Sequence, residues 1–243
     1  MNTNSLSQHL LSLLDLTDLS DNCREETIET LVRKAIQSHV PAICVWPQFV
    51  SLSAHLLQKT DIRVATVLNF PKGGDNVERI IDDAEEALKD GADEIDLVMP
   101  YHAFLAGDEP ITRSMIAEVK DLMPDDAILK IILESGAFTN QAQLSAACHL
   151  AIEEGADFLK TSTGKLAISA TPEAATTMLK AIKATGGTCG FKASGGIKMI
   201  EDAKIYLDLA VDIMGETWIT PDHFRIGASS LYDVLLAKTS GAF

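Results

Sequence analysis

Three lysines lie inside short apolar segments that have the character of buried strands. They are Lys130 in Ile128–Leu133, Lys160 in Phe158–Ser162 and Lys192 in Cys189–Ala193. Lysine is rarely buried unless its charge is paired, so three of them on consecutive strands call for a common explanation. For each one alone, the alternative is a side chain at a strand end that extends to solvent.

Buried lysines that lie close together can act as nucleophiles. Neighbouring strands are about 4.8 Å apart, so three ammonium groups facing one interior would repel one another. Repulsion and loss of solvent both lower the pKa of a lysine. A lysine that is neutral near pH 7 attacks a carbonyl carbon and forms a Schiff base.

Two aspartates can accompany these lysines. Asp96 lies in the apolar segment Glu94–Met99, and Asp15 is at the end of the segment Leu11–Leu16. A carboxylate beside the lysines can keep one of them charged while another loses its proton, and it can pass protons through water. The alternative for Asp96 is an ion pair with no part in catalysis.

Small and cationic residues follow the last three strand segments. They are Thr163, Gly164 and Lys165, then Gly195, Gly196 and Lys198, then Gly227, Ser229 and Ser230. Glycines let backbone N–H groups approach a phosphate, and a following helix adds its dipole. In barrels, phosphate commonly binds in the loops after strands seven and eight. The set therefore predicts an anion site beside the lysines.

Other cofactor and metal motifs are absent from the sequence. It has no HxH, HExxH or CxxC spacing, and no GxGxxG follows a strand segment, so we expect no metal and no nicotinamide cofactor. Thr163-Gly-Lys165 lacks the upstream glycine of a phosphate-binding loop for ATP. Pyridoxal phosphate remains a competing hypothesis, because it would also use a strand lysine and a phosphate site.

Cys44, in Ile43–Trp46, is either a small core residue or part of the site.

Composition limits the class of protein. The 243 residues are 47% hydrophobic, and 20 Lys and Arg against 35 Asp and Glu give a formal charge of −15. This excludes a disordered chain, and it argues against binding to nucleic acids or anionic membranes. No apolar run has the roughly 18 to 20 residues of a membrane span. The N-terminus shows no export signal and the four cysteines are scattered, so we expect a cytoplasmic protein with reduced thiols.

Alternation of apolar and amphipathic segments predicts the fold. The eight strand segments are Leu11–Leu16, Ala42–Trp46, Val64–Phe70, Glu94–Met99, Ile128–Leu133, Phe158–Ser162, Cys189–Ala193 and Phe224–Ala228. Between them lie helical segments such as Asn76–Asp90, Gln141–Glu154, Pro172–Ala184 and Ile200–Leu209. This α/β pattern favours a single (β/α)₈ TIM barrel over residues 1–243, with a short N-terminal helical extension and a loose tail over about 239–243. An open, doubly wound sheet is the alternative.

At these residues the sequence resembles the deoxyribose-phosphate aldolase family. The most specific segments are Gly91–Asp96, Gly155–Lys165 and Gly190–Gly196. The resemblance implies a cofactor-free barrel that splits 2-deoxy-D-ribose 5-phosphate into acetaldehyde and D-glyceraldehyde 3-phosphate.

The resemblance also implies roles for individual residues. Lys160 corresponds to the Schiff-base lysine, and Lys192 and Asp96 correspond to the residues that activate it. Asp15, Cys44 and Lys130 line the same site. The phosphate site of the family corresponds to Gly164, Lys165, Gly195, Gly196, Gly227, Ser229 and Ser230. Lys198 stands where the family often has arginine, and it can bind phosphate only as a point charge.

Two further classes of function stay open on the sequence alone. One is another Schiff-base sugar-phosphate aldolase or a transaldolase-like barrel, and the other is a non-catalytic protein that binds phosphosugars. The expected partners are a small sugar phosphate and acetaldehyde, within a homodimer or another homo-oligomer. The expected context is deoxyribose catabolism.

Overall fold

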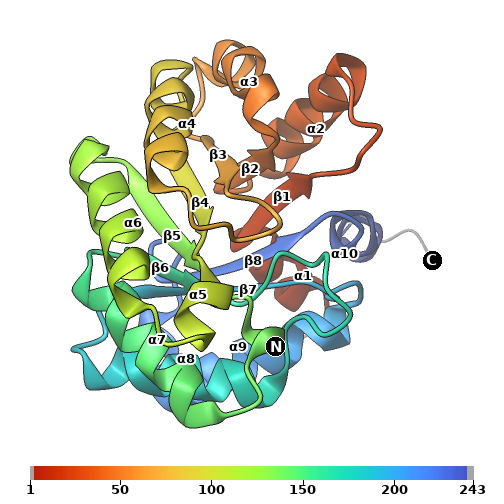
Figure 1. The fold of residues 1–243 in the computed structure, drawn as a ribbon. Helices are drawn as coiled ribbons and strands as arrows, with labels where there is room; N and C mark the ends of the chain where they lie inside the picture. Colours follow the sequence, from red (N-terminus) through yellow and green to blue (C-terminus); the bar gives the residue numbers. More distant parts are fainter. Residues whose placement is uncertain (1–2, 240–243) are drawn as a thin grey trace.

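Eight parallel strands form a closed barrel in the computed structural model, which describes residues 3–239. β1 pairs with both β2 and β8, so the sheet has no free edge (Figure 1). The strands are β1 (Leu14–Asp18), β2 (Ala42–Val45), β3 (Arg63–Leu68), β4 (Glu94–Val98), β5 (Ile128–Ile132), β6 (Phe158–Lys160), β7 (Gly190–Ser194) and β8 (Phe224–Ala228). The predicted (β/α)₈ barrel is confirmed, and the open sheet is excluded.

Helices surround the barrel and connect its strands (Figure 1). They are α1 (Thr3–Leu11), α2 (Glu25–Ser38), α3 (Val50–Leu57), α4 (Val77–Lys89), α5 (Tyr101–Leu105), α6 (Glu109–Leu122), α7 (Gln141–Glu153), α8 (Pro172–Ala184), α9 (Ile200–Met214) and α10 (Leu231–Thr239). Single 3-10 turns occur at Pro47–Phe49, Ser135–Ala137 and Glu216–Trp218. α1 packs against α10. Within residues 3–239, no helix is long and apolar enough to cross a membrane.

Several helix ends follow from local chemistry. At the start of α8 the Thr171 side chain accepts a hydrogen bond from the Ala174 N–H, with Pro172 in the first turn. Gly91 and Gly155 follow α4 and α7 with φ of 100° and 96°, a backbone conformation that glycine adopts without a Cβ clash. These two glycines therefore allow the chain to turn where α4 and α7 end.

Some predicted boundaries differ from the structure. The first strand was expected at Leu11–Leu16, but Leu11 ends α1, and pairing with β2 and β8 places β1 at Leu14–Asp18. Here sheet pairing outweighs the apolar run. α9 extends five residues beyond the expected Leu209, as far as the turn at Gly215. Of the tail expected over about 239–243, residues 240–243 lie outside the described part of the chain, and Thr239 ends α10.

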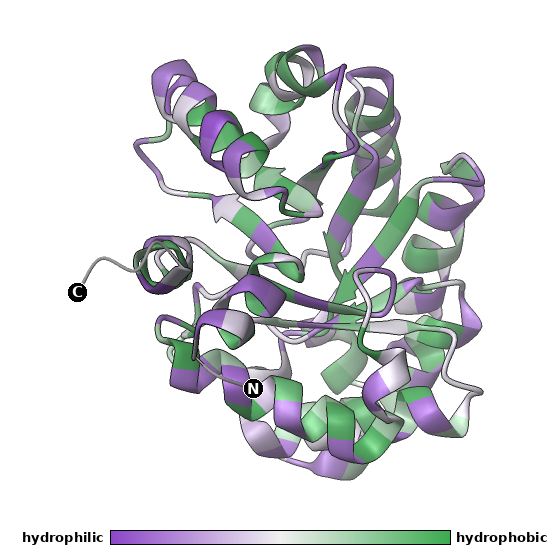
Figure 2. Cartoon of the chain, turned by 180° about the vertical axis from the view of Figure 1, so that it is seen from behind, coloured by the Kyte–Doolittle hydropathy of each residue, from purple (hydrophilic) through white to green (hydrophobic). Residues whose placement is uncertain are grey.

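Each strand is covered on both faces. The outward side chains, such as Leu97 and Ile131, are fully buried in the apolar layer beneath the helices. The helices carry hydrophobic and hydrophilic residues in separate bands (Figure 2). The inward positions hold charged side chains, including Asp96 and Lys130, which are also completely buried. The outer face of the barrel sheet, beneath the helices, is therefore apolar, and its inner face carries charged side chains.

Candidate active site

Seven charged side chains lie inside the barrel, and we call them the interior charge cluster. All are at most 5% exposed, and they come from six strands: Asp15, Glu94, Asp96, Lys130, Lys160, Lys192 and Arg225. Strand register brings them together, because Asp96 pairs with Lys130 and Lys192 lies between Lys160 and Arg225. The three lysines do not reach solvent as strand-end side chains would.

Asp96 binds all three lysines. Its Oδ1 lies 2.8 Å from Lys130 Nζ, and its Oδ2 lies 2.7 Å from both Lys160 Nζ and Lys192 Nζ. Burial alone would raise the pKa of this carboxyl, but the three ammonium groups bring it well below its ordinary value. Asp96 therefore stays ionised in the interior.

The three lysines differ in how many carboxylates they contact. Lys130 pairs with Glu94 and Asp96 and lies 3.9 Å from Asp15, and Lys192 lies 2.5 Å from Asp15 and 2.7 Å from Asp96. Among residues 3–239, Asp96 is the only carboxylate within ion-pair distance of Lys160.

This difference separates the lysine pKa values. Burial lowers the pKa of Lys160 below its ordinary value, and the charge of Lys192 lowers it further, against the attraction of Asp96. For Lys192, Asp15 and Asp96 outweigh burial and raise the pKa. For Lys130, Asp96 and Glu94 outweigh burial in the same way. Lys160 is the lysine of the three that loses its proton most readily.

Charge balance in the cluster supports the same conclusion. The cluster has four cationic groups (three lysines and Arg225) and three carboxylates when every group is ionised. Loss of one proton makes it neutral, and an uncompensated charge is costly in a buried site. Lys160 has the fewest partners, so it is the group from which that proton leaves.

A cavity of about 830 Å³ opens above the charge cluster. Ten predicted site residues line it: Lys160, Thr163, Gly164, Lys165, Gly195, Gly196, Lys198, Gly227, Ser229 and Ser230. The other five lie deeper and are completely buried: Asp15, Cys44, Asp96, Lys130 and Lys192. Within the described chain, Lys160 is the member of the interior charge cluster that also lines the cavity.

Two glycine loops form one wall of the cavity. A Cβ on Gly195, which has φ of 92°, would lie 3.1 Å from Gly164 Cα and 2.7 Å from Ser169 Cβ. Thr161 and Ser194 join the same loops, since the Thr161 hydroxyl donates to Ser194 O and accepts from Ser194 N–H, both at 2.9 Å. Only glycine permits this backbone approach, which leaves N–H groups able to face an anion.

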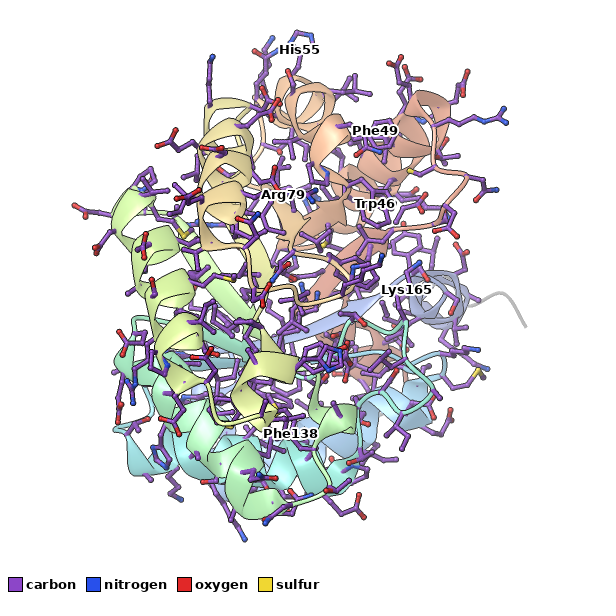
Figure 3. All side chains as sticks on the ribbon, viewed as in Figure 1. Trp46, Phe49, His55, Arg79, Phe138 and Lys165 are labelled. Carbon is purple, nitrogen blue, oxygen red and sulfur yellow. The ribbon has the colours of Figure 1, made fainter. Side chains whose placement is uncertain are left out.

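Lysines are present at the edge of the cavity. The Lys165 side chain, labelled in Figure 3, donates to the Leu19 carbonyl at 3.0 Å and lies 3.8 Å from Asp21. Lys198 is exposed on the loop after β7. The Lys165 ammonium group therefore lies against the loop after β1, and Lys198 follows the two glycines of the loop after β7.

Gly227 and Cys44 have structural roles in the barrel interior. A Cβ on Gly227 would lie 2.9 Å from Lys192 Cε, so this glycine makes room for the Lys192 side chain. Cys44 is packed with Ala65 and Val67 in a small apolar cluster. Burial raises the pKa of its thiol, which therefore stays protonated in the barrel interior.

Two members of the charge cluster, Glu94 and Arg225, were not among the residues predicted from the sequence. Arg225 donates to Asp15 at 2.6 Å and to Glu94 at 3.4 Å. Despite burial, Lys192 and then Arg225 keep the pKa of Asp15 far below its usual range. The alternation of side chains along a strand could have indicated both residues. Glu94 lies on the same strand face as Asp96, and Arg225 lies on the same strand face as Gly227.

Among residues 3–239, no group of three or more His, Cys, Asp or Glu side chains is arranged to hold a metal ion.

The fold and the site together define a class of enzyme. In this (β/α)₈ barrel, a lysine with a lowered pKa lies at the floor of a cavity lined by glycines and lysines. This arrangement is typical of a Schiff-base aldolase. Comparison with protein families agrees: the model of the DeoC/LacD family of aldolases matches residues 10–236. The chain belongs to this family.

Individual relatives cover nearly the whole chain. A deoxyribose-phosphate aldolase from Agrobacterium fabrum is 47% identical over 234 residues, covering 95% of this chain and 90% of the relative. An apo crystal structure from Toxoplasma gondii ME49, assigned as a deoxyribose-phosphate aldolase, has a TM-score of 0.90 at 26% identity and covers 99% of this chain and 98% of its own. The tetrameric deoxyribose phosphate aldolase from Aeropyrum pernix has a TM-score of 0.80 at 26% identity, covering 99% of both chains.

Proposed function

We propose that this aldolase reversibly cleaves 2-deoxy-D-ribose 5-phosphate to acetaldehyde and D-glyceraldehyde 3-phosphate, with Lys160 as its Schiff-base nucleophile. The observation that carries the proposal is the position of Lys160. It contacts the interior charge cluster through Asp96 and also lines the cavity. The 47% identity to a relative named for this activity supports the choice of substrate.

The first step is attack by the neutral Lys160 amine on the C1 aldehyde of the open-chain sugar. The adduct loses water and leaves a protonated imine between Lys160 and C1. Because Lys192 and Lys130 have raised pKa values, they stay cationic while Lys160 reacts.

The second step breaks the bond between C2 and C3. Asp96, acting through a water molecule and with Lys192, takes the proton from the C3 hydroxyl group as the C3 carbonyl forms. The bond electrons move into the iminium group to give an enamine, and glyceraldehyde 3-phosphate leaves. Protonation at C2 and hydrolysis of the imine then release acetaldehyde and restore Lys160.

The phosphate group binds away from the reacting carbons. The glycine loops supply backbone N–H groups, and Lys165 and Lys198 supply positive charge. Binding energy from this remote group orients C1 to C3 over Lys160. Asp15 and Lys130 hold Lys192 and Asp96 in place from below.

The setting of the enzyme is part of the proposal. The named relative acts on deoxyribose phosphate, which fits a cytoplasmic enzyme of deoxyribose catabolism. The tetrameric relative from Aeropyrum pernix supports a homo-oligomer for this chain.

Borohydride trapping tests the nucleophile. The protein is incubated with acetaldehyde, reduced, digested and mapped by mass spectrometry, with Lys160→Met as the control. We expect one reduced adduct, on the peptide that contains Lys160. An unmodified Lys160 peptide would refute the mechanism. Binding of sugar phosphate without cleavage would instead indicate a non-catalytic protein.

A further inference from the structure

A buried carboxyl group outside the proposed mechanism lies beside the cavity. Glu134 follows β5 by two residues and is completely buried. Its backbone has φ of 53° and ψ of 57°, the left-handed conformation that non-glycine residues rarely adopt. The surrounding structure therefore has to hold the Glu134 backbone in this conformation.

Within the described chain, the Glu134 carboxylate accepts hydrogen bonds from one residue, Thr163. Its Oε2 accepts from the Thr163 hydroxyl at 2.6 Å and from the Thr163 N–H at 3.3 Å. Within residues 3–239, its Oε1 has no hydrogen-bond partner. Glu134 itself does not line the cavity, whereas Thr163 does.

The contact continues into the loop after β6. Because its proton goes to Glu134, the Thr163 hydroxyl oxygen can accept the Lys165 N–H, at 3.1 Å. Gly164 lies between these two residues with φ of 77°. The chain of hydrogen bonds from Glu134 through Thr163 to Lys165 thus fixes the turn whose three residues line the cavity.

From this arrangement we propose that Glu134 is a positioning residue for phosphate recognition, acting through Thr163 on the turn 163–165. It does not touch the reacting carbons. The proposal rests on the proposed function, because it names how the same site recognises the phosphate of its substrate. It requires a hydrogen-bond acceptor at position 134 and does not require a proton donor.

The test compares two substrates within each variant. The measured quantity is the ratio of kcat/KM for 2-deoxyribose 5-phosphate to kcat/KM for unphosphorylated 2-deoxyribose. Any loss of folded enzyme or of Lys160 reactivity affects both terms and cancels. We expect Glu134→Ala to lower the ratio by about tenfold or more, since hydrogen bonds to a charged acceptor are lost.

Glu134→Gln is the matched control. Its amide oxygen can accept both Thr163 hydrogen bonds, so the ratio should stay within about threefold of wild type. Equal losses of the ratio in the alanine and glutamine variants would overturn the proposal, because a retained hydrogen-bond acceptor would then not preserve phosphate recognition. An unchanged ratio in Glu134→Ala would also overturn it.

A second pair of variants tests the other side of the contact. Thr163→Val removes the hydroxyl group at constant shape, and Thr163→Ser keeps it. We expect Thr163→Val to lower the ratio and Thr163→Ser to preserve it. Adding Glu134→Ala to Thr163→Val should cause little further loss, because residues in one hydrogen-bond chain are not additive; full additivity would contradict the proposal.

Inorganic phosphate gives a readout that does not use the phosphorylated substrate. As an inhibitor of 2-deoxyribose cleavage, it should bind Glu134→Ala more weakly than Glu134→Gln, and equal inhibition of the two would count against the proposal. If the wild-type enzyme cleaves neither sugar, the proposed function is wrong. If it cleaves both and Glu134→Ala keeps the phosphate preference, only the role of Glu134 is wrong.

Discussion

Replacing Lys192 by methionine should raise the pKa of Lys160. Both ammonium nitrogens lie 2.7 Å from the same oxygen, Asp96 Oδ2, so they are separated by no more than twice that distance. Two unit charges about 5 Å apart, at an effective dielectric constant of about 20, repel by about 3 kcal/mol. This corresponds to about two pKa units. The variant also leaves Asp15 and Asp96 with one cation fewer, and this change raises the pKa of Lys160 as well.

The assay is the rate of borohydride-trapped imine formation with acetaldehyde as a function of pH. At a pH below both midpoints, the neutral fraction of Lys160 should fall about a hundredfold in Lys192→Met. The rate should recover as pH rises, with the midpoint about two units higher than in the wild-type enzyme. Because the midpoint is measured, a loss of rate for another reason is distinguished from a shift in pKa.

The control variant is Lys198→Met, which makes the same substitution on an exposed loop. Solvent screens the Lys198 charge, so the midpoint should stay where it is in wild type. A midpoint that does not move in Lys192→Met, or moves down, would refute the electrostatic account of Lys160.

Three other variants test the barrel and the cavity. Asp96→Asn removes the carboxylate shared by three lysines, so unfolding in urea at pH 7 should show a loss of about 3 to 5 kcal/mol; a loss below 1 kcal/mol would be inconsistent with this account. A Cβ at position 190 would lie 2.5 Å from the Phe158 ring, so Gly190→Ala should lose about 1 to 3 kcal/mol and melt at a lower temperature. Lys165→Met should raise KM for 2-deoxyribose 5-phosphate by about tenfold. An equal effect on unphosphorylated 2-deoxyribose would show that Lys165 does not recognise phosphate.

Sequence periodicity predicted much of the site, and its limits are physical. Buried lysines on consecutive strands and an aspartate on an earlier one are visible in the sequence, because an inward position recurs every second residue. The sequence does not show that Asp96 forms ion pairs with all three lysines, because this contact depends on barrel closure and strand register. The separation of lysine pKa values depends in turn on how many carboxylates lie within about 4 Å of each.

The residues that were missed show where local patterns fail. Glu134 comes after β5 has ended, and its left-handed backbone turns the chain out of the strand period. Its partner Thr163 is 29 residues away. A contact of this kind follows from the packing of two loops, which neither hydropathy nor motif spacing encodes.

The signs of the interior charges divide the barrel into two halves. Strands β1 to β4 supply the three carboxylates, Asp15, Glu94 and Asp96, and strands β5 to β8 supply the four cations. If the N-terminal half (β1 to β4) or the C-terminal half (β5 to β8) paired with a second copy of itself, the resulting barrel would enclose charges of one sign only. Self-pairing is therefore disfavoured and pairing of unlike halves is favoured. Separately expressed N- and C-terminal halves of this chain have the electrostatic complementarity to assemble with each other and not with themselves.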